Sequence, residues 1–188
     1  QVSKTVELLL SSLISTAAYT YFTFGNTLQL LPVGLFGTSI AKAALPTLSR
    51  EADSPEKFAK TLSQSLYQIV FLVIPIATVL IVLRIPIVRL VYGTEIFSWE
   101  STVQTGYVVS AFAFGVVFQA ATAILARGFY AMGDTKTPVI VSIASISLVV
   151  IASVVFILGL SIPVWGLAAA FSLGSFFQAT ILFYLIGK

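Results

Sequence analysis

The chain has 188 residues, of which 58% are hydrophobic and only 9% are charged, and its mean hydropathy is +1.04. A water-soluble domain carries more charge than this on its surface, so the composition predicts an all-α integral membrane protein. The formal net charge of +3 is too small and too scattered for nucleic acid binding. Because cysteine and histidine are absent, disulfides, Cys or His zinc sites, thiol catalysis and histidine acid–base chemistry are excluded.

The apolar stretches predict about five and a half transmembrane helices, at roughly 20 residues per crossing. The predicted spans are residues 1–15, 17–48, 61–83, 103–127, 138–160 and 163–187. The first is partial, and the chain does not begin with Met, so we interpret the N-terminus as a cut end.

Charged residues inside the first predicted span are candidates for function, because charge is costly within a membrane. Lys4 and Glu7 are three residues apart and therefore share a helix face, where they can pair. One interpretation is that they form a polar face on a transport cavity or ion path. The alternative is that they lie near the end of a truncated helix, from which their side chains extend to water.

The second predicted span contains three helix-disturbing residues near its middle, Pro32, Gly34 and Gly37. They predict a kink or break, and we expect them to act as a hinge during cavity opening. Leucine in place of Gly34 or Gly37 is then expected to impair transport while preserving membrane insertion.

Three polar residues, Asn26, Thr27 and Gln29, come just before this predicted break. Polar groups beside a broken helix need partners or water, so they are candidates for a cavity wall and for substrate contact. The alternative is ordinary hydrogen bonding between helices.

The polar links between spans carry further signals. In the charged link 49–60, Ser54 and Pro55 predict a helix start with proline at the first position. In residues 84–102, the short apolar stretch IPIVRLVYG predicts a helix lying at the membrane interface, with Tyr92 and Trp99 at headgroup level.

The link ARGFYAMGDTKTP, residues 126–138, contains Arg127 and is predicted to be a cytoplasmic turn. We expect Gly133 and Asp134 to make the turn and Lys136 to fix topology. Thr137 is predicted as the N-cap of the next helix, with Pro138 at its first position.

The distribution of basic residues predicts orientation. Alternating links place one group of basic residues on the side of the C-terminus: Lys42, Arg50, Lys57, Lys60, Arg127, Lys136 and Lys188. The opposite side has Arg84 and Arg89. The positive-inside rule therefore predicts a cytoplasmic C-terminus.

An enzyme is not expected. The spans contain no carboxylate pair spaced for acid–base catalysis, and the sequence has no phosphate-binding loop of the P-loop type. Broken helices and a polar face between spans are instead typical of a transporter, and no cofactor is expected.

Three segments resemble motifs of the MurJ/MviN lipid II flippase family. LQLLPVGLFGTSIAKAALPTLSREA (28–52) is similar to its eighth transmembrane helix, IVRLVYGTEIF (87–97) to the link after the ninth, and ARGFYAMGDTKTPV (126–139) to the link between the tenth and eleventh. The segments occur in the family's order and spacing, so the resemblance covers essentially the whole chain.

The resemblance implies the fold of the multidrug/oligosaccharidyl-lipid/polysaccharide exporter superfamily, in which two helical bundles face a central cavity. Residues 1–188 would be one lobe, the second bundle, from a partial seventh to the twelfth helix, with the first lobe as its missing partner. The implied activity is flipping lipid II, a lipid-linked oligosaccharide, from the cytoplasmic to the outer leaflet of the bacterial inner membrane by alternating access.

Two departures from the family pattern bear on the substrate. The family often has Ala-Asp-Arg-Leu before the proline of its eighth helix, whereas this chain has Asn26 and Thr27 where the Asp and Arg are expected. Some members bind a cation, for which Glu7 is the acidic candidate within a span. The alternatives are therefore a flippase or exporter of the same superfamily for another lipid-linked oligosaccharide or a drug, or a membrane scaffold without transport.

Overall fold

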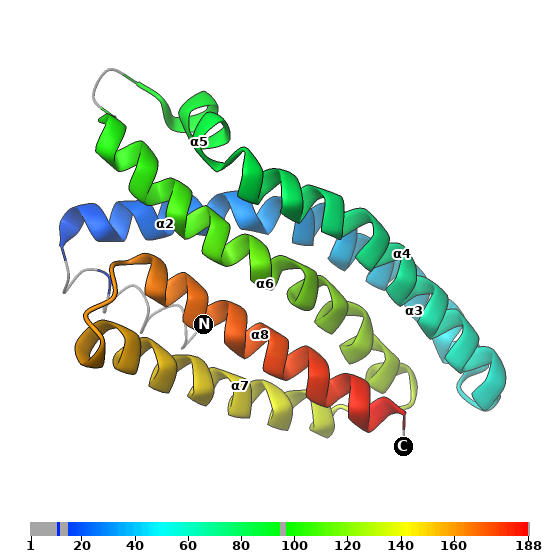
Figure 1. The fold of residues 1–188 in the computed structure, drawn as a ribbon. Helices are drawn as coiled ribbons and strands as arrows, with labels where there is room; N and C mark the ends of the chain where they lie inside the picture. The colour runs from blue at the N-terminus through cyan, green and yellow to red at the C-terminus, as the bar shows by residue number, and fades with distance from the viewer. Residues whose placement is uncertain (1–10, 12–14, 95–96, 188) are drawn as a thin grey trace.

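The computed structural model describes residue 11 and residues 15–94 and 97–187, and over these residues the chain is helical with no strand (Figure 1). The helices are α2 (Thr16–Pro32), α3 (Ser39–Glu51), α4 (Pro55–Val82), α5 (Arg84–Tyr92), α6 (Trp99–Ala131), α7 (Lys136–Val154) and α8 (Trp165–Ile186). Two π-helical segments, η1 (Val33–Thr38) and η2 (Val155–Gly159), continue α2 into α3 and extend α7.

Five helical stretches within the described residues are long and apolar enough to cross a membrane: Thr16–Arg50, Pro55–Val82, Trp99–Ala131, Lys136–Gly159 and Trp165–Ile186. They confirm the five complete spans predicted from hydropathy. Except for Ser11 and Ser15, the predicted partial span 1–15 lies outside the described residues.

The prediction that residues 49–60 form a link is wrong in extent. The α3 helix continues to Glu51 and α4 begins at Pro55, so the link comprises only residues 52–54. Hydropathy marks the part of a helix that lies in hydrocarbon, but lysine and glutamate are good helix formers and continue the helix beyond it. The α6 helix also extends past the predicted span 103–127 at both ends.

Local sequence explains where the helices begin. The amide of Ala18 donates to Ser15 Oγ at 3.0 Å, and the amide of Ser101 donates to Ser98 Oγ at 3.1 Å, so a serine caps both α2 and α6. Ser54 is the N-cap residue of α4 and Pro55 its first residue, as predicted.

The α6 helix is the centre of the bundle, and every other described α-helix packs against it. Its closest neighbour is α8, where Ser172 Oγ donates to the Ala111 carbonyl at 2.6 Å. A methyl group built on Gly115 would lie 2.5 Å from Ser172 Oγ and 2.8 Å from its Cα. The two backbones therefore approach closely because a glycine faces a small residue, as is common between membrane helices.

The short helix predicted between residues 84 and 102 is confirmed as α5, which joins α4 to α6 and contacts α2 through Tyr92. The Tyr92 ring stacks on the Phe24 ring of α2 with centroids 4.1 Å apart, and its hydroxyl donates to the Phe24 carbonyl at 3.3 Å. The interfacial position of α5 stays a prediction.

The links alternate between the two ends of the bundle (Figure 1). The α3–α4 link, the α6–α7 link and the end of α8 lie at one end. The α5 helix and the link between η2 and α8 lie at the other end. This alternation agrees with the topology predicted from the apolar spans.

The irregularity predicted around Pro32 is present, as a wide helical turn in place of a break. Pro32 has no N–H to donate to the preceding turn, and residues 33–38 adopt π-helical hydrogen bonding. The hydroxyls of Thr38 and Ser39 both donate to the Gly34 carbonyl, at 2.9 and 3.1 Å. The helix axis changes direction between α2 and α3 (Figure 1).

Candidate functional site

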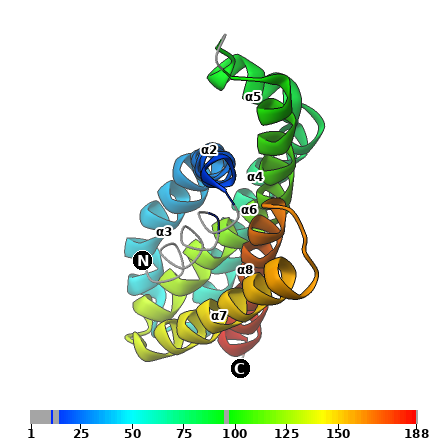
Figure 2. The same cartoon turned by 90° about the vertical axis from the view of Figure 1, so that its left-hand side faces the viewer.

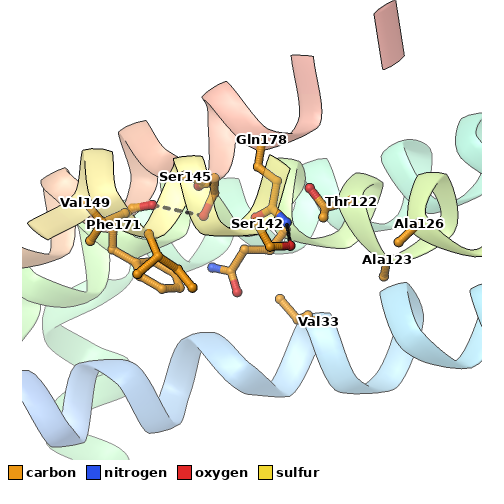
Figure 3. A pocket seen from close by; sticks show the side chains of 12 residues that line it. Val33, Thr122, Ala123, Ala126, Ser142, Ser145, Val149, Phe171 and Gln178 are labelled. Atoms are coloured by element: carbon orange, nitrogen blue, oxygen red, sulfur yellow. Dashed lines mark hydrogen bonds between the residues drawn. The ribbon is translucent and has the colours of Figure 1, made fainter. Parts of the chain in front are cut away.

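A polar cavity of about 360 Å³ lies between α6, α7 and α8, with Val33 of η1 on its far side (Figure 3). Figure 2 shows the ribbons of these three helices side by side. Its polar lining comes from Gln119, Thr122, Ser142, Ser145, Ser175 and Gln178. These residues lie near the middle of the three spans, and polar sites of secondary transporters occur at this depth. None of the described residues that line the cavity is charged.

The polar lining comes in pairs spaced three residues apart, one pair on each of the three helices. A spacing of three places both members of a pair on one helix face. Gln178 Nε2 donates to Ser142 Oγ at 2.8 Å, and Ser145 Oγ donates to the Gly174 carbonyl at 2.7 Å. Thr122 Oγ1 is buried and has no hydrogen-bond partner among the described residues.

A chain of amide side chains connects this cavity to α2. Gln119 Nε2 donates to Gln29 Oε1 at 2.8 Å, and Gln29 Nε2 donates to Asn26 Oδ1 at 2.9 Å. Gln29 is 1% exposed, so both ends of its amide depend on protein partners. Asn26 and Gln29 therefore adjoin the cavity through Gln119. The Gln29–Gln119 bond is also the hydrogen bond between helices that the alternative interpretation expected.

The remaining substrate candidates are not brought to this site. The exposed Thr27 donates its hydroxyl to the Thr23 carbonyl on its own helix. Lys4 and Glu7, including the proposal of Glu7 as a cation ligand, lie outside the described residues. Within the described part of the chain, no group of three His, Cys, Asp or Glu residues is placed to hold a metal ion.

Among the cavity residues, Gln119 and Gln178 were not among the candidates that the sequence suggested. Both make hydrogen bonds between helices, and both line the cavity, where Figure 3 shows Gln178. The repeated spacing of three between polar residues in three successive spans was the signal that could have identified them.

The three hinge candidates lie in different surroundings. Gly37 packs against α6, where a methyl group built on it would lie 2.9 Å from both Cα and Cβ of Ala120. A methyl group on Gly34 would meet no atom of a described residue within 4 Å. Pro32 is buried at the end of α2. A substitution at Gly37 therefore disturbs helix packing, whereas one at Gly34 does not.

The turn predicted at Gly133 and Asp134 is confirmed. Gly133 has a positive φ of 79°, and its amide donates to the Tyr130 carbonyl at 3.0 Å, while the Asp134 amide donates to the Phe129 carbonyl at 2.9 Å. This pair of bonds is the Schellman arrangement that commonly ends a helix at glycine.

Arg127, the other charged residue predicted in this link, lies within α6. Its Nη1 donates to the Ala123 carbonyl of the same helix at 2.8 Å, on the turn that borders the cavity.

The prediction of Thr137 as the N-cap of the next helix is wrong, because α7 begins at Lys136, two residues before the predicted start at Pro138, and its N-cap residue is Thr135. Asp134 Oδ1 accepts from the amides of Lys136 and Thr137 at 2.9 and 3.0 Å. The carboxylate therefore satisfies the amides that a capping hydroxyl would have taken, and Pro138 occupies the third helical position. Hydrogen bonds from the Thr137 hydroxyl and amide, and from the Lys136 amide, lower the pKa of Asp134 below its ordinary value.

We expect Asp134→Ala to loosen the first turn of α7. The amides of Lys136 and Thr137 lose their acceptor, so their hydrogen exchange should become roughly threefold to tenfold faster. Because the folded-state pKa of Asp134 is lowered, the stabilisation is fully present above the ordinary aspartate pKa of about 4 and is lost as the pH falls below it. Hydrogen exchange between pH 3 and pH 6 measures both effects.

Asp53 supplies the matched control, because it is exposed in the α3–α4 link and accepts no hydrogen bond from any residue that the structure describes. Asp53→Ala should leave the exchange of Lys136 and Thr137 unchanged. Equal exchange in the Asp134 and Asp53 variants would contradict the capping role.

Comparison with known proteins gives a consistent family assignment. The family profile described as lipid II flippase MurJ matches residues 1–188. A probable lipid II flippase MurJ from Rhizobium meliloti is 31% identical over 183 residues, covering 95% of this chain and 34% of that protein. A probable lipid II flippase MurJ from Vibrio cholerae is 28% identical over 191 residues, covering 97% of this chain and 35% of that protein.

The fold agrees with a solved structure of lipid II flippase MurJ in an inward closed conformation. The two superpose with a TM-score of 0.85 at 25% identity, over 100% of this chain and 40% of the solved chain. This chain thus spans about a third of the length of the relatives it matches. From the profile match over the whole sequence and the shared helical fold, the chain belongs to the MurJ lipid II flippase family of multi-pass membrane transporters.

Proposed function

We propose that residues 1–188 form the second helical bundle of a flippase that moves lipid II from the cytoplasmic to the outer leaflet of the bacterial inner membrane by alternating access. The observation that carries this proposal is the family match over the whole chain, at about a third of the length of the relatives. The first bundle would be supplied by the rest of a longer chain.

The polar cavity supports a passive, hydrogen-bonding role for this bundle in transport. Its described lining offers amide and hydroxyl groups but no cation to neutralise a pyrophosphate. Asn26 and Thr27 stand where the family often has Asp and Arg. We therefore assign charge recognition of the substrate to residues outside the described cavity, with Lys4 as the candidate within this chain.

The proposed orientation places the C-terminus and the α6–α7 link in the cytoplasm. The basic residues described at that end outnumber Arg84 and Arg89 at the other. Because the chain has no cysteine, Thr135→Cys in the exposed link can be labelled with a membrane-impermeant maleimide. Labelling from the outside of intact cells would contradict this orientation.

The direct test is to express the full-length protein in bacteria depleted of their own lipid II flippase. Restored growth and restored appearance of lipid II in the outer leaflet are expected. A protein that inserts and folds at normal levels but restores neither would contradict the lipid II assignment.

The hinge hypothesis is tested most cleanly at Gly34. Gly34→Ala and Gly34→Leu add side chains into open space, so insertion and folding should be preserved. If the π-helical turn must change its backbone conformation during transport, the reduced conformational freedom of the substituted residue should slow lipid II flipping several-fold. Flipping at the normal rate by both variants would exclude a hinge at this residue.

The sequence alone suggested Gly37→Leu as a second test of the hinge. In the structure this variant also disturbs helix packing, so it does not test the hinge by itself. Its side chain would collide with the backbone of Ala120 and separate η1 from α6. A transport defect in that variant would therefore report lost packing, and it serves as a positive control for misfolding.

A further inference from the structure

A second, apolar cavity lies on the outer face of the bundle, away from the polar cavity. Its volume is about 580 Å³, within the range of ligand pockets. It is formed by the faces of α6 and α8 together with η2 and the link that follows it. We call it the outer groove; its lining includes Tyr107, Ala111, Phe114, Phe156, Trp165 and Ala169.

The shape of the outer groove follows from the spacing of residues on its two long helices. Tyr107, Ser110, Ala111 and Phe114 lie on one face of α6, and Trp165, Ala169, Ser172 and Leu173 lie on one face of α8. Alanine and serine form the floor, and aromatic rings form the walls. Phe114 is 60% exposed and Tyr107 is 45% exposed, so the groove opens outward at the surface of the bundle.

The floor offers no free hydrogen-bonding group to a polar ligand. Ser110 Oγ donates to the Gly106 carbonyl at 3.1 Å, and Ser172 Oγ donates to the Ala111 carbonyl at 2.6 Å. Both hydroxyls thus bond to backbone within the bundle, and the surface that remains is hydrocarbon and aromatic. This chemistry fits an acyl chain better than a sugar or a peptide.

One end of the outer groove carries a positive charge. The Arg84 guanidinium carbon lies 5.6 Å from the centre of the Tyr107 ring, a cation–π distance. Arg84 Nη1 donates to the Ile81 carbonyl at 3.2 Å, while its Nε is buried without a hydrogen-bond partner. No acidic side chain within the described residues forms an ion pair with it.

Tyr107 and Trp165 lie at this same end, and tyrosine and tryptophan are enriched where a membrane meets water. From Tyr107 to Phe114 is seven residues, or about 10 Å along α6 toward the membrane centre. A headgroup at Arg84 would therefore stand at the interface while its acyl chain extends inward along the groove.

We propose that the outer groove binds an anionic phospholipid of the leaflet on the α5 side, with its phosphate at Arg84 and one acyl chain between α6 and α8. The charge of Arg84, which lies over the Tyr107 ring, favours an anionic headgroup. The apolar floor beside it favours a hydrocarbon tail joined to that headgroup. This site is separate from the polar cavity and does not depend on the transported substrate.

The test measures lipid retained by the full-length protein in detergent, using native mass spectrometry during titration with dioleoylphosphatidylglycerol or dioleoylphosphatidylcholine. We expect one phosphatidylglycerol to bind more tightly than phosphatidylcholine. Arg84→Gln should weaken phosphatidylglycerol binding about tenfold, because a charge-assisted contact to phosphate is lost, and leave phosphatidylcholine binding unchanged.

Substitutions that fill or open the outer groove should weaken the binding of both lipids. Ala169→Leu fills the floor and Phe114→Ala removes an exposed wall without disturbing the core, so each should reduce binding of both lipids several-fold. Arg89→Gln on α5 and Ala144→Leu on the exposed side of α7 are matched controls that should change neither.

Four results would overturn the proposal. Equal affinity for the two lipids, or equal effects of Arg84→Gln and Arg89→Gln, would exclude headgroup recognition by Arg84. Unchanged binding in both Ala169→Leu and Phe114→Ala would exclude the groove as the tail site. No retained lipid in the unsubstituted protein would show that another segment of the longer chain covers this face.

Discussion

Gln29→Leu is expected to reduce lipid II flipping roughly tenfold in the full-length protein, a change that corresponds to about 1.4 kcal/mol. Gln29 is buried between Asn26 and Gln119 and uses both ends of its amide. Leucine has a similar size but leaves the Gln119 amide without its acceptor, so Gln119 can turn and alter the polar wall. The loss in folding free energy should be smaller, about 1 kcal/mol, as is typical of a hydrogen bond between membrane helices.

The effect of losing the Gln29 hydrogen bonds can be distinguished from a general effect of replacing a glutamine with leucine. Gln68→Leu on the exposed face of α4 removes the same amide where it makes no hydrogen bond to a described residue, and it should leave flipping unchanged. In a double-mutant cycle, Gln29→Leu and Gln119→Leu should be coupled by about 1 kcal/mol. Additive effects of the two substitutions would show that the Gln29–Gln119 bond contributes nothing.

Gly115→Ala should destabilise the bundle by about 1–3 kcal/mol, and Gly115→Val by about 3 kcal/mol or more. The added methyl group would lie 2.8 Å from Ser172 Cα, so the backbone of α8 must move away from α6. That movement also strains the bond from Ser172 to the Ala111 carbonyl. Denaturation of the protein in mixed detergent micelles, followed by circular dichroism, measures the change in folding free energy.

Gly34 provides the matched pair for this experiment, because the same substitutions there meet open space. Gly34→Ala and Gly34→Val should change stability by less than about 1 kcal/mol, in either direction. If the Gly115 and Gly34 variants lost stability equally, the effect would come from helix propensity and the close α6–α8 contact would not be its cause.

Features that depend only on nearby residues could be predicted from the sequence. The five complete spans follow from continuous apolar stretches, and the start of α4 follows from Ser54 and Pro55. The turn at Gly133 follows from the tolerance of glycine for positive φ. The choice between Asp134 and Thr137 as the cap was missed because both residues can cap, and only the backbone geometry selects between them.

The polar cavity could be anticipated only in part. The sequence indicated Asn26 and Gln29 as polar residues beside an irregular helix, but their partner Gln119 is 90 residues away from Gln29. The choice of this partner depends on how α2 and α6 are rotated about their axes. Hydropathy contains no information about that rotation, because residues facing lipid and residues facing other helices are both apolar.

The sequence by itself determined the membrane class, the number of complete spans and the local turns, because transfer into hydrocarbon and backbone hydrogen bonding act over short stretches of chain. Only the tertiary structure decided which polar side chains meet and where the two cavities lie. Close packing at contacts such as Gly115 against Ser172 sets the rotation and spacing of the helices. That rotation brings Gln119 and Gln178 to the polar cavity and leaves the outer groove open beside Arg84.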